Sequence, residues 1–297
     1  MTEPIDEELV VTLQRARQRF LDLVADVRPE LHRYCARMTG SVFDGEDVVQ
    51  EALAKAHFAL AQLGEPPPLR PWLFRIAHNT ALDFLRRAEN RLTDATHEVE
   101  LPLPAVEPEP DPALVEAAII RFTALTPKQR SALALKDVIG LTLEETAEAM
   151  GTTVLAVKSA LSRARAELAG AREIETVKPP EAELSQLRHY AHLFNARDWE
   201  GLRALFTDES NVELVSRWQR AGHDATKYFG RYSEVADAEG MRAAAGIADG
   251  VPVIAVFRTR HPTYFMRVTW AGSKVASVRD FHFTPWVARE ARFTRLR

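Results

Sequence analysis

The sequence predicts a multidomain protein whose first half is all-α and whose last part is α+β. Residues 8–92 and about 112–174 carry apolar side chains at helical spacings of three and four, whereas short runs rich in β-branched and aromatic residues begin near 212. Proline-rich segments at 93–113 and 178–180 separate these stretches. A length of 297 residues leaves room for two or three domains, and a hydrophobic content of 46% is enough for packed cores.

The composition excludes several classes of protein. A formal net charge of −4 argues against a chain that coats nucleic acid along its whole length, so any DNA contact must come from local basic faces. The one cysteine, Cys35, cannot form an intrachain disulfide and is too little for a zinc site. No stretch approaches the ~20 apolar residues that span a bilayer, and the first ten residues lack a signal pattern. We therefore expect a soluble cytoplasmic protein with no membrane partner, no metal and no other cofactor.

Helix boundaries in the first half follow from proline and glycine. A helix is predicted to begin at Pro29 and to end at 39–41, and a second is predicted at about 44–63. The segment 64–68 holds glycine and three prolines and cannot stay helical. A further helix is predicted at about 71–90.

The helix at 71–90 interleaves aromatic with cationic side chains. Aromatic rings stack on unpaired bases at roughly 1–3 kcal/mol each, while cations hold phosphates, and a protein that opens a duplex needs both. The alternative is that the aromatic residues belong to the core and that the arginines are only solvated. The residues concerned are Trp72, Phe74, Phe84, Arg70, Arg75, Arg86 and Arg87.

Residues 126–168 predict a helix-turn-helix. Thr126 can cap one helix, and the pair Thr142 and Glu145 has the spacing of a capping box at the start of the next. Gly151 breaks that helix, and the following one has a polar and basic outer face. Its apolar stripe consists of Val154, Val157, Leu161, Ala164 and Leu168. An ordinary helical hairpin with a solvated basic face is the alternative.

The C-terminal part predicts two helices followed by strands. The helices are expected at 181–195 and 198–206, and the strands at 212–218, 253–260, 264–270 and 275–283. Ala271-Gly272-Ser273 is expected to form the hairpin turn between the last two strands.

Two motif blocks resemble the sigma-70 family. The run DGEDVVQEA, followed by PWLFRIAHNTALDFLRR, is similar to region 2, and LTPKQRSALALKDVIGLTLEETAEAMGTTVLAVKSALSRARAEL is similar to region 4. Only a linker separates them, which resembles the layout of extracytoplasmic-function (ECF) sigma factors. The resemblance implies a region 2 domain at 8–92 that binds polymerase and melts the −10 element. It further implies an acidic, proline-rich linker at 93–113 and a region 4 domain at 114–174 that recognises the −35 element.

The resemblance also implies roles for individual residues. The expected polymerase-binding residues are Asp44, Asp47, Gln50 and Glu51, and a helix face of carboxylates and amides suits a basic partner. The expected −10 contacts are Trp72, Arg75, Asn79, Arg86 and Arg87. The expected −35 contacts are Lys158, Ser159, Ser162, Arg163 and Arg165. Many family members carry arginine where this chain has Ala160, which implies that one common DNA contact is missing.

Residues 181–297 resemble the SnoaL-like fold, on the helix pair HLFNARDWEGLRALFTDE and the late run VRDFHF. This implies a cone-shaped α+β domain with a pocket. The candidate pocket residues are Tyr228, Trp270, Asp280 and His282. Asp280 and His282 are expected to alternate onto one face of the last strand, where they could act as a general base. Alternatively, this face is the solvent side, or His282 is a pocket residue whose hydrogen bonds are satisfied. The aromatic residues are equally suited to a core.

The function expected from these observations is that of a sigma factor, not an enzyme, that is regulated by its own C-terminal domain. Its expected partners are bacterial core RNA polymerase, promoter DNA, and a small-molecule or protein regulator of the last domain. One alternative is a one-component helix-turn-helix regulator with a ligand-binding domain. Another is an enzyme with an accessory DNA-binding half.

Overall fold

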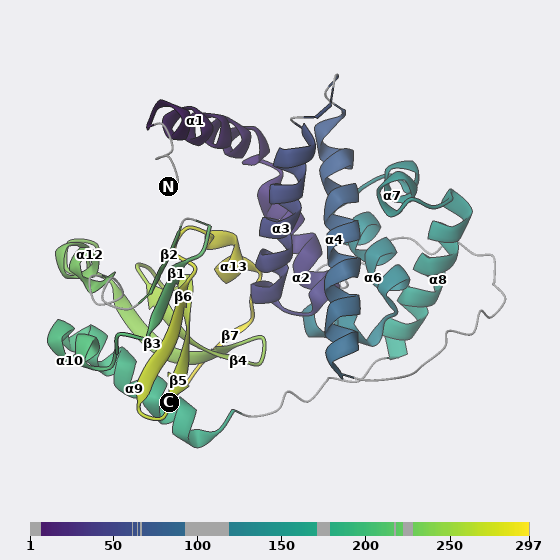
Figure 1. The fold of residues 1–297 in the computed structure, drawn as a ribbon. Helices are drawn as coiled ribbons and strands as arrows, with labels where there is room; N and C mark the ends of the chain where they lie inside the picture. The colour runs from purple at the N-terminus through teal and green to yellow at the C-terminus, as the bar shows by residue number, and fades with distance from the viewer. Residues whose placement is uncertain are drawn as a thin grey trace. The chain divides into compact units, whose positions relative to one another are not determined.

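The computed structural model describes residues 7–60, 62–63, 65, 67–92, 119–170, 179–216, 218–221 and 228–296. The chain divides into two compact units, Met1–Glu173 and Ile174–Arg297 (Figure 1). The predicted linker at 93–113 lies outside the described residues. Over the described ranges, no helix is long and apolar enough to cross a membrane. The same ranges contain no cluster of three or more His, Cys, Asp or Glu side chains that could hold a metal ion.

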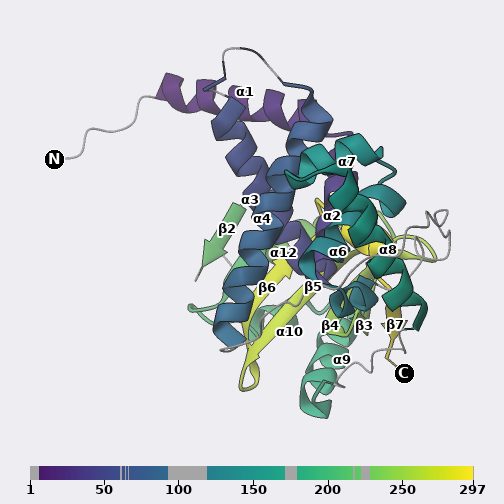
Figure 2. The same ribbon diagram turned by 90° about the vertical axis from the view of Figure 1, so that its right-hand side faces the viewer.

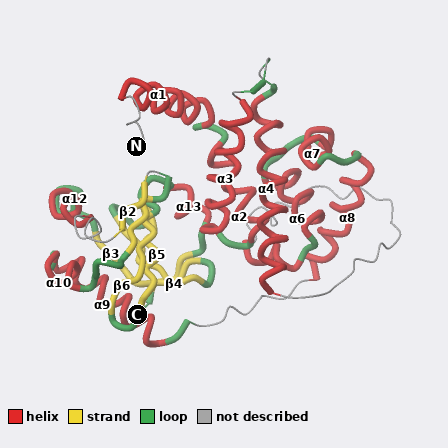
Figure 3. The backbone as a smooth tube through the Cα atoms, viewed as in Figure 1, coloured by secondary structure: helices red, strands yellow, loops and turns green. Residues whose placement is uncertain are grey.

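The described part of the first unit is helical throughout, as predicted (Figure 3). Its helices are α1 (Glu7–Val24), α2 (Arg28–Thr39), α3 (Val42–Leu60), α4 (Leu69–Leu92), the 3-10 helix η1 (Ile119–Ala124), α6 (Pro127–Leu133), the π-helical turn η2 (Ala134–Val138), α7 (Leu143–Met150) and α8 (Val154–Gly170).

Local sequence signals set the boundaries of the helix-turn-helix. Thr126 and Thr142 both form the predicted capping boxes, in which each side chain accepts a hydrogen bond from the third residue of its helix. Gly151 ends α7 in the left-handed region, with a φ of 61° that favours glycine. The turn therefore redirects the chain into α8, as the sequence predicts.

A single hydrophobic core joins the helices of the first unit. It extends from Phe20 and Val24 on α1 to Leu161 and Leu168 on α8. Helices α2 and α3 approach closely at Gly45, where an added Cβ would lie 2.6 Å from the backbone of Ala36. Only glycine permits this approach. Because the core is continuous, α2 and α4 pack directly on the helices that carry the helix-turn-helix.

The second unit is built on one seven-stranded sheet, in the order β2-β1-β6-β5-β4-β3-β7. Its strands are β1 (Asn211–Leu214), β2 (Trp218–Ala221), β3 (Arg242–Ala248), β4 (Val251–Phe257), β5 (Pro262–Ala271), β6 (Lys274–Asp280) and β7 (Phe293–Arg295). Its helices are α9 (Glu181–Ala196), α10 (Trp199–Ala204), α12 (Tyr228–Val235) and α13 (Pro285–Glu290). The expected α+β class is therefore present.

The two faces of this sheet carry different helices. Helix α9 packs along β3 and β4 (Figure 2), and side chains of α9, α10 and α12 share one core with this face. Helix α13 packs on β5 and lies on the other side of the sheet (Figure 1). β1 runs parallel to β6, and the other pairings are antiparallel.

Several strand predictions need correction. The expected strand at 275–283 ends at Asp280, and His282 lies in the following turn, so the prediction that both alternate on one strand is wrong. The run at 212–218 breaks after Leu214, where Ser216 adopts a φ of 74°. The predictions missed β3, because its sequence RAAAGIA is rich in alanine and has little β-propensity. The turn at 271–273 joins β5 to β6 as predicted.

Candidate nucleic-acid interface

One exposed face of α4 carries a polar row. Arg75, Asn79 and Arg86 are exposed, and their spacings of four and seven place them on one side of the helix. The aromatic residues of α4 mostly face inward, because Phe74 is fully buried and Trp72 is half-buried against the core. The alternative that these aromatic residues belong to the core is therefore correct for Phe74. The edge of Trp72 remains partly accessible beside Arg75.

Arg70 belongs to the structural framework of the first unit. Its Nε donates a 2.9 Å hydrogen bond to Glu30 Oε2, and Nη2 donates to the carbonyl of Ile139 at 3.4 Å. Its guanidinium also lies over the ring of Phe74, 5.5 Å from the centroid. Arg70 thus ties α4 to α2 and to the segment before α7.

The acidic residues of α3 divide into an outer and an inner set. Asp44, Asp47 and Gln50 are half-exposed on the outer side of the helix. Glu46 is completely buried and forms an ion pair of 2.7 Å with Arg28. Sequence reasoning missed Glu46, although its position between Asp44 and Asp47 gives a different helical face. The buried carboxylate of Glu46 therefore stabilises the contact between α2 and α3.

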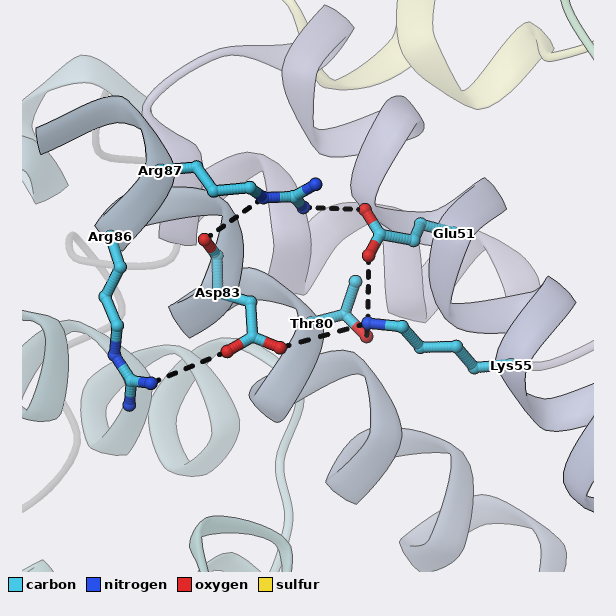
Figure 4. A network of polar contacts seen from close by, with 6 residues as sticks. All are labelled: Glu51, Lys55, Thr80, Asp83, Arg86 and Arg87. Carbon is cyan, nitrogen blue, oxygen red and sulfur yellow. Dashed lines mark hydrogen bonds and ion pairs between the residues drawn. The ribbon is translucent and has the colours of Figure 1, made fainter. Parts of the chain in front are cut away.

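Glu51 belongs to a surface network between α3 and α4 (Figure 4). Its carboxylate accepts a 2.7 Å hydrogen bond from Arg87 and pairs with Lys55 at 2.8 Å. Lys55 reaches Asp83 at 3.9 Å, and Asp83 pairs with Arg86 at 3.6 Å. Partial burial by itself would raise the pKa of Glu51, but the hydrogen bonds from Lys55 and Arg87 outweigh it and lower that pKa. The expected polymerase contact Glu51 is thereby joined to two expected DNA contacts, Arg86 and Arg87.

Helix α8 presents a mixed outer face. Lys158 and Arg163 are exposed, Ser159 and Ser162 are half-buried, and Arg163 donates a 3.2 Å hydrogen bond to Ser159. Leu155 is 71% exposed, which leaves a large apolar side chain on this face. The outer face of α8 therefore carries two cations, two hydroxyl groups and one large apolar side chain.

Two positions of α8 face inward. Arg165 donates two hydrogen bonds to the carboxylate of Asp137, at 2.9 and 2.7 Å, and so anchors α8 to η2. The side chain of Asp137 is fully buried in this pair. Ala160 is only 6% exposed and packs in the core, so an arginine would have to leave that core to reach DNA.

A buried polar triad connects α2, α4 and α6. The hydroxyl of Tyr34 lies 3.0 Å from His78 Nδ1 and 2.9 Å from Ser131 Oγ, and Ser131 lies 2.9 Å from His78 Nδ1. Burial lowers the pKa of His78 to about 4, so the imidazole is neutral at pH 7. Arg130 beside it donates to the carbonyls of Met38, Thr123 and Leu125. Sequence reasoning did not find this triad, because its members are far apart in the chain.

In the second unit, Asp280 is enclosed by tyrosines. The hydroxyls of Tyr228 and Tyr232 both donate to Asp280 Oδ2, the latter at 2.8 Å, and Tyr264 lies 2.8 Å from Tyr232. The carboxylate is 1% exposed. Burial raises the pKa of Asp280, and the two tyrosine hydrogen bonds only partly offset that rise. Two of the predicted pocket residues, Tyr228 and Asp280, therefore meet in a buried site.

The other two predicted pocket residues are arranged differently. The backbone amide of His282 donates to Asp280 Oδ1 at 2.9 Å, and its ring packs edge-on against Tyr264. Trp270 packs against the core from β5, and its indole nitrogen has no hydrogen-bond partner among the described residues. The sequence could have suggested Tyr232, since it lies four residues after Tyr228 on one helical face.

Two stretches of the chain match family models. Residues 23–91 match sigma-70 region 2, and residues 122–168 match sigma-70, region 4. The first stretch holds α2, α3 and most of α4, and the second holds α6, α7 and most of α8. The exposed row on α4 and the outer face of α8 thus fall in different regions.

Known proteins share longer stretches with this chain. The ECF RNA polymerase sigma factor SigG of Mycobacterium tuberculosis is 33% identical over 263 residues, which cover 77% of this chain and 71% of SigG. SigJ of the same organism is 35% identical over 149 residues, 47% of this chain and 46% of SigJ. A solved structure of the Bartonella quintana sigma factor RpoE, in complex with the anti-sigma factor NepR, is 25% identical. It covers 51% of this chain and 94% of RpoE with a TM-score of 0.40.

Proposed function

This chain belongs to the ECF RNA polymerase sigma factors, and we propose that it directs promoter-specific transcription initiation. In this role it binds core RNA polymerase and promoter DNA and has no catalytic activity of its own. The observation that carries the proposal is that one chain exposes polar and basic side chains on both α4 and α8, together with half-exposed acidic side chains on α3. A one-component regulator needs only the side chains on α8.

The proposed division of labour follows the chain. Residues 8–92 bind polymerase and act on the −10 element, and residues 114–174 read the −35 element. The acidic segment 93–113 connects them. Residues 181–297 form a regulatory domain.

For polymerase binding we assign Asp44, Asp47, Gln50 and Glu51. Three of them are half-exposed on the outer side of α3, and Glu51 is held by cations that a basic partner can replace. A positively charged surface of the polymerase fits this face.

For the −10 element we assign Trp72, Arg75, Asn79, Arg86 and Arg87. The exposed row on α4 supports this assignment, since it offers an amide that can bond to a base and cations for phosphates. For the −35 element we assign Lys158, Ser159, Ser162, Arg163 and Arg165. Arg165 reaches DNA only at its partly exposed edge, and its main contribution is to fix the angle of α8.

The second unit supports a SnoaL-like regulatory role. Its sheet carries α9, α10 and α12 on one face, as expected for a cone, and Tyr228 and Asp280 meet inside. The carboxylate of Asp280 is buried and accepts hydrogen bonds from two tyrosine hydroxyls, which supports a structural role for it over a role as a general base. The buried site around Asp280 is suited to a domain that serves as a stable scaffold.

Assembly with core polymerase tests the central proposal. Charge reversal at Asp47 and Glu51 together should weaken binding of core polymerase and should abolish transcription from promoters selected with the wild-type protein. The same double reversal at Glu200 and Glu209, which are exposed acids of the second unit, provides the matched control. Unchanged polymerase affinity of the Asp47 and Glu51 double variant would reject the assigned face. DNA binding without any polymerase binding by the wild-type chain would instead favour the one-component regulator.

A further inference from the structure

The face of the sheet that carries α13 has an aromatic cluster of its own. Phe293 of β7 lies 5.9 Å from Phe257 and 5.7 Å from Phe265, measured between ring centroids. Along β5, Phe265 alternates with Tyr264 and Met266, which belong to the core on the opposite face. This cluster is therefore separated by the sheet from the site around Asp280.

Gly246 of β3 holds Phe293 in place. A Cβ at Gly246 would lie 2.1 Å from the Phe293 ring, so the ring occupies the space that any other residue would fill. The neighbouring β7 strand pairs with β3, with Arg295 opposite Gly246. The backbone of β3 at Gly246 therefore fixes the position of the Phe293 ring.

Next to these rings is a cleft of about 670 Å³ with a strongly basic lining. Its volume falls within the roughly 300–1,000 Å³ of small-molecule sites. Its polar lining comes from Arg260 and His261 between β4 and β5, Arg289 on α13, and Arg295 on β7, and its apolar lining includes Phe257 and Phe293. The described lining residues include no Asp or Glu.

The cations of the cleft differ from five other arginines of this unit. Ion pairs with nearby carboxylates hold Arg188, Arg197, Arg203, Arg258 and Arg279. Arg260, Arg289 and Arg295 have no such partner among the described residues. Three exposed guanidinium groups from three elements line one cleft, where their positive potentials add. An anion bound among them would form charge-assisted contacts with all three.

We propose that this cleft binds a small anion that carries a planar apolar group, such as an aryl phosphate or an aryl carboxylate. Guanidinium groups bind phosphate and carboxylate oxygens with charge-assisted, bidentate hydrogen bonds. The rings of Phe257 and Phe293 offer a flat apolar wall for the rest of the ligand. The proposal concerns residues of the second unit alone and does not depend on polymerase binding.

Titration calorimetry of the full-length chain with phenyl phosphate tests the proposal. Phenyl phosphate should bind with one site per chain, and inorganic phosphate should bind more weakly, because it lacks the ring. Arg289→Gln and Arg295→Gln should each weaken phenyl phosphate binding about tenfold, the loss expected for a charge-assisted hydrogen bond. Phe293→Leu should reduce the preference for phenyl phosphate over inorganic phosphate. Arg203→Gln, which removes an arginine that already has a carboxylate partner, is the control and should change neither.

Three results would overturn the proposal. The first is no binding of phenyl phosphate at millimolar concentration. The second is binding that survives both arginine substitutions in folded variants, as judged by circular dichroism. The third is binding of hexaglutamate without binding of phenyl phosphate, which would indicate an acidic protein partner instead. A chain that binds polymerase but fails these tests would keep its proposed function and lose only this site.

Discussion

Arg87 donates a 2.7 Å hydrogen bond to Glu51 across 36 residues of sequence and thereby joins the C-terminal half of α4 to α3 (Figure 4). Glu51 lies on the proposed polymerase face, and Arg87 is a proposed −10 contact. Both side chains are more than one-third exposed, so solvent screens the pair and it adds little to stability. A polymerase cation can therefore displace Arg87 at little cost and leave it available for DNA.

Glu51→Gln should loosen this link while keeping the shape of the side chain. We expect polymerase binding to weaken, since one carboxylate of the docking face is lost, while the free energy of unfolding changes by less than about 1 kcal/mol. Polymerase titration and urea unfolding measure the two effects. Asp83→Asn, which removes a neighbouring carboxylate outside the proposed docking residues, serves as the control. Equal loss of polymerase affinity in both variants would contradict the special role of Glu51.

His78 should make the stability of the first unit depend on pH. Burial lowers its pKa from about 6.5 to about 4, so between these values the unfolded chain binds a proton that the folded chain excludes. The contribution to stability is complete above pH 6.5 and should fall by about 3 kcal/mol as the pH decreases to 4. Urea unfolding across this range measures the slope. His78→Gln should flatten it, whereas the exposed His261→Gln should not; an unchanged slope in His78→Gln would refute the prediction.

Substitution of Arg165 should affect stability and substitution of Arg163 should affect DNA binding, although the two residues lie two positions apart. Arg165→Gln leaves the buried carboxylate of Asp137 without its partner, which costs about 3–5 kcal/mol of stability. Arg163→Gln removes an exposed cation, so it should leave stability unchanged, weaken DNA binding, and reduce the salt slope by about one. Thermal unfolding and fluorescence anisotropy with −35 DNA separate the two. A stable Arg165→Gln variant would show that the ion pair does not anchor α8.

Asn79 should act on promoter opening without affecting the fold. Its side chain is exposed, and Asn79→Ala should change stability by no more than about 0.5 kcal/mol. We expect slower opening at the −10 element, because we propose that the exposed amide bonds to an unpaired base. Permanganate reactivity of promoter thymines in a reconstituted holoenzyme measures opening, with the exposed Glu89→Ala as the control on α4. Normal opening in Asn79→Ala would remove this residue from the −10 site.

Removal of the residues after 178 should change promoter output. The proposed regulatory domain is tied to the DNA-binding half by a short segment, and a short tether gives even weak contacts a high effective concentration. We expect transcription from selected promoters to differ between the truncated and full-length proteins at equal polymerase saturation. Circular dichroism of the truncated chain confirms that its helices remain. Identical output from both proteins would exclude regulation from within the chain.

Much of the first unit could be read from local sequence. The capping boxes at Thr126 and Thr142 and the left-handed turn at Gly151 each depend on residues no more than four positions apart. Interactions over so short a distance arise as soon as a helix forms, because its geometry dictates which residues meet. The helical half and the helix-turn-helix were therefore predictable, whereas the C-terminal sheet was predictable only in part, since β3 was missed.

The tertiary structure decided which side chains are exposed and which are buried in contacts with distant segments. No local pattern in the sequence links Tyr34 to His78 or Ser131. Packing of α2, α4 and α6 nevertheless brings the three residues together across separations of up to 97 residues. It also turns Ala160 inward, joins Arg165 to Asp137, and ends β6 before His282. Helical periodicity states which residues share a face, but it does not state what that face meets. That depends on burial and on partners from distant segments, which only the packed core brings into contact.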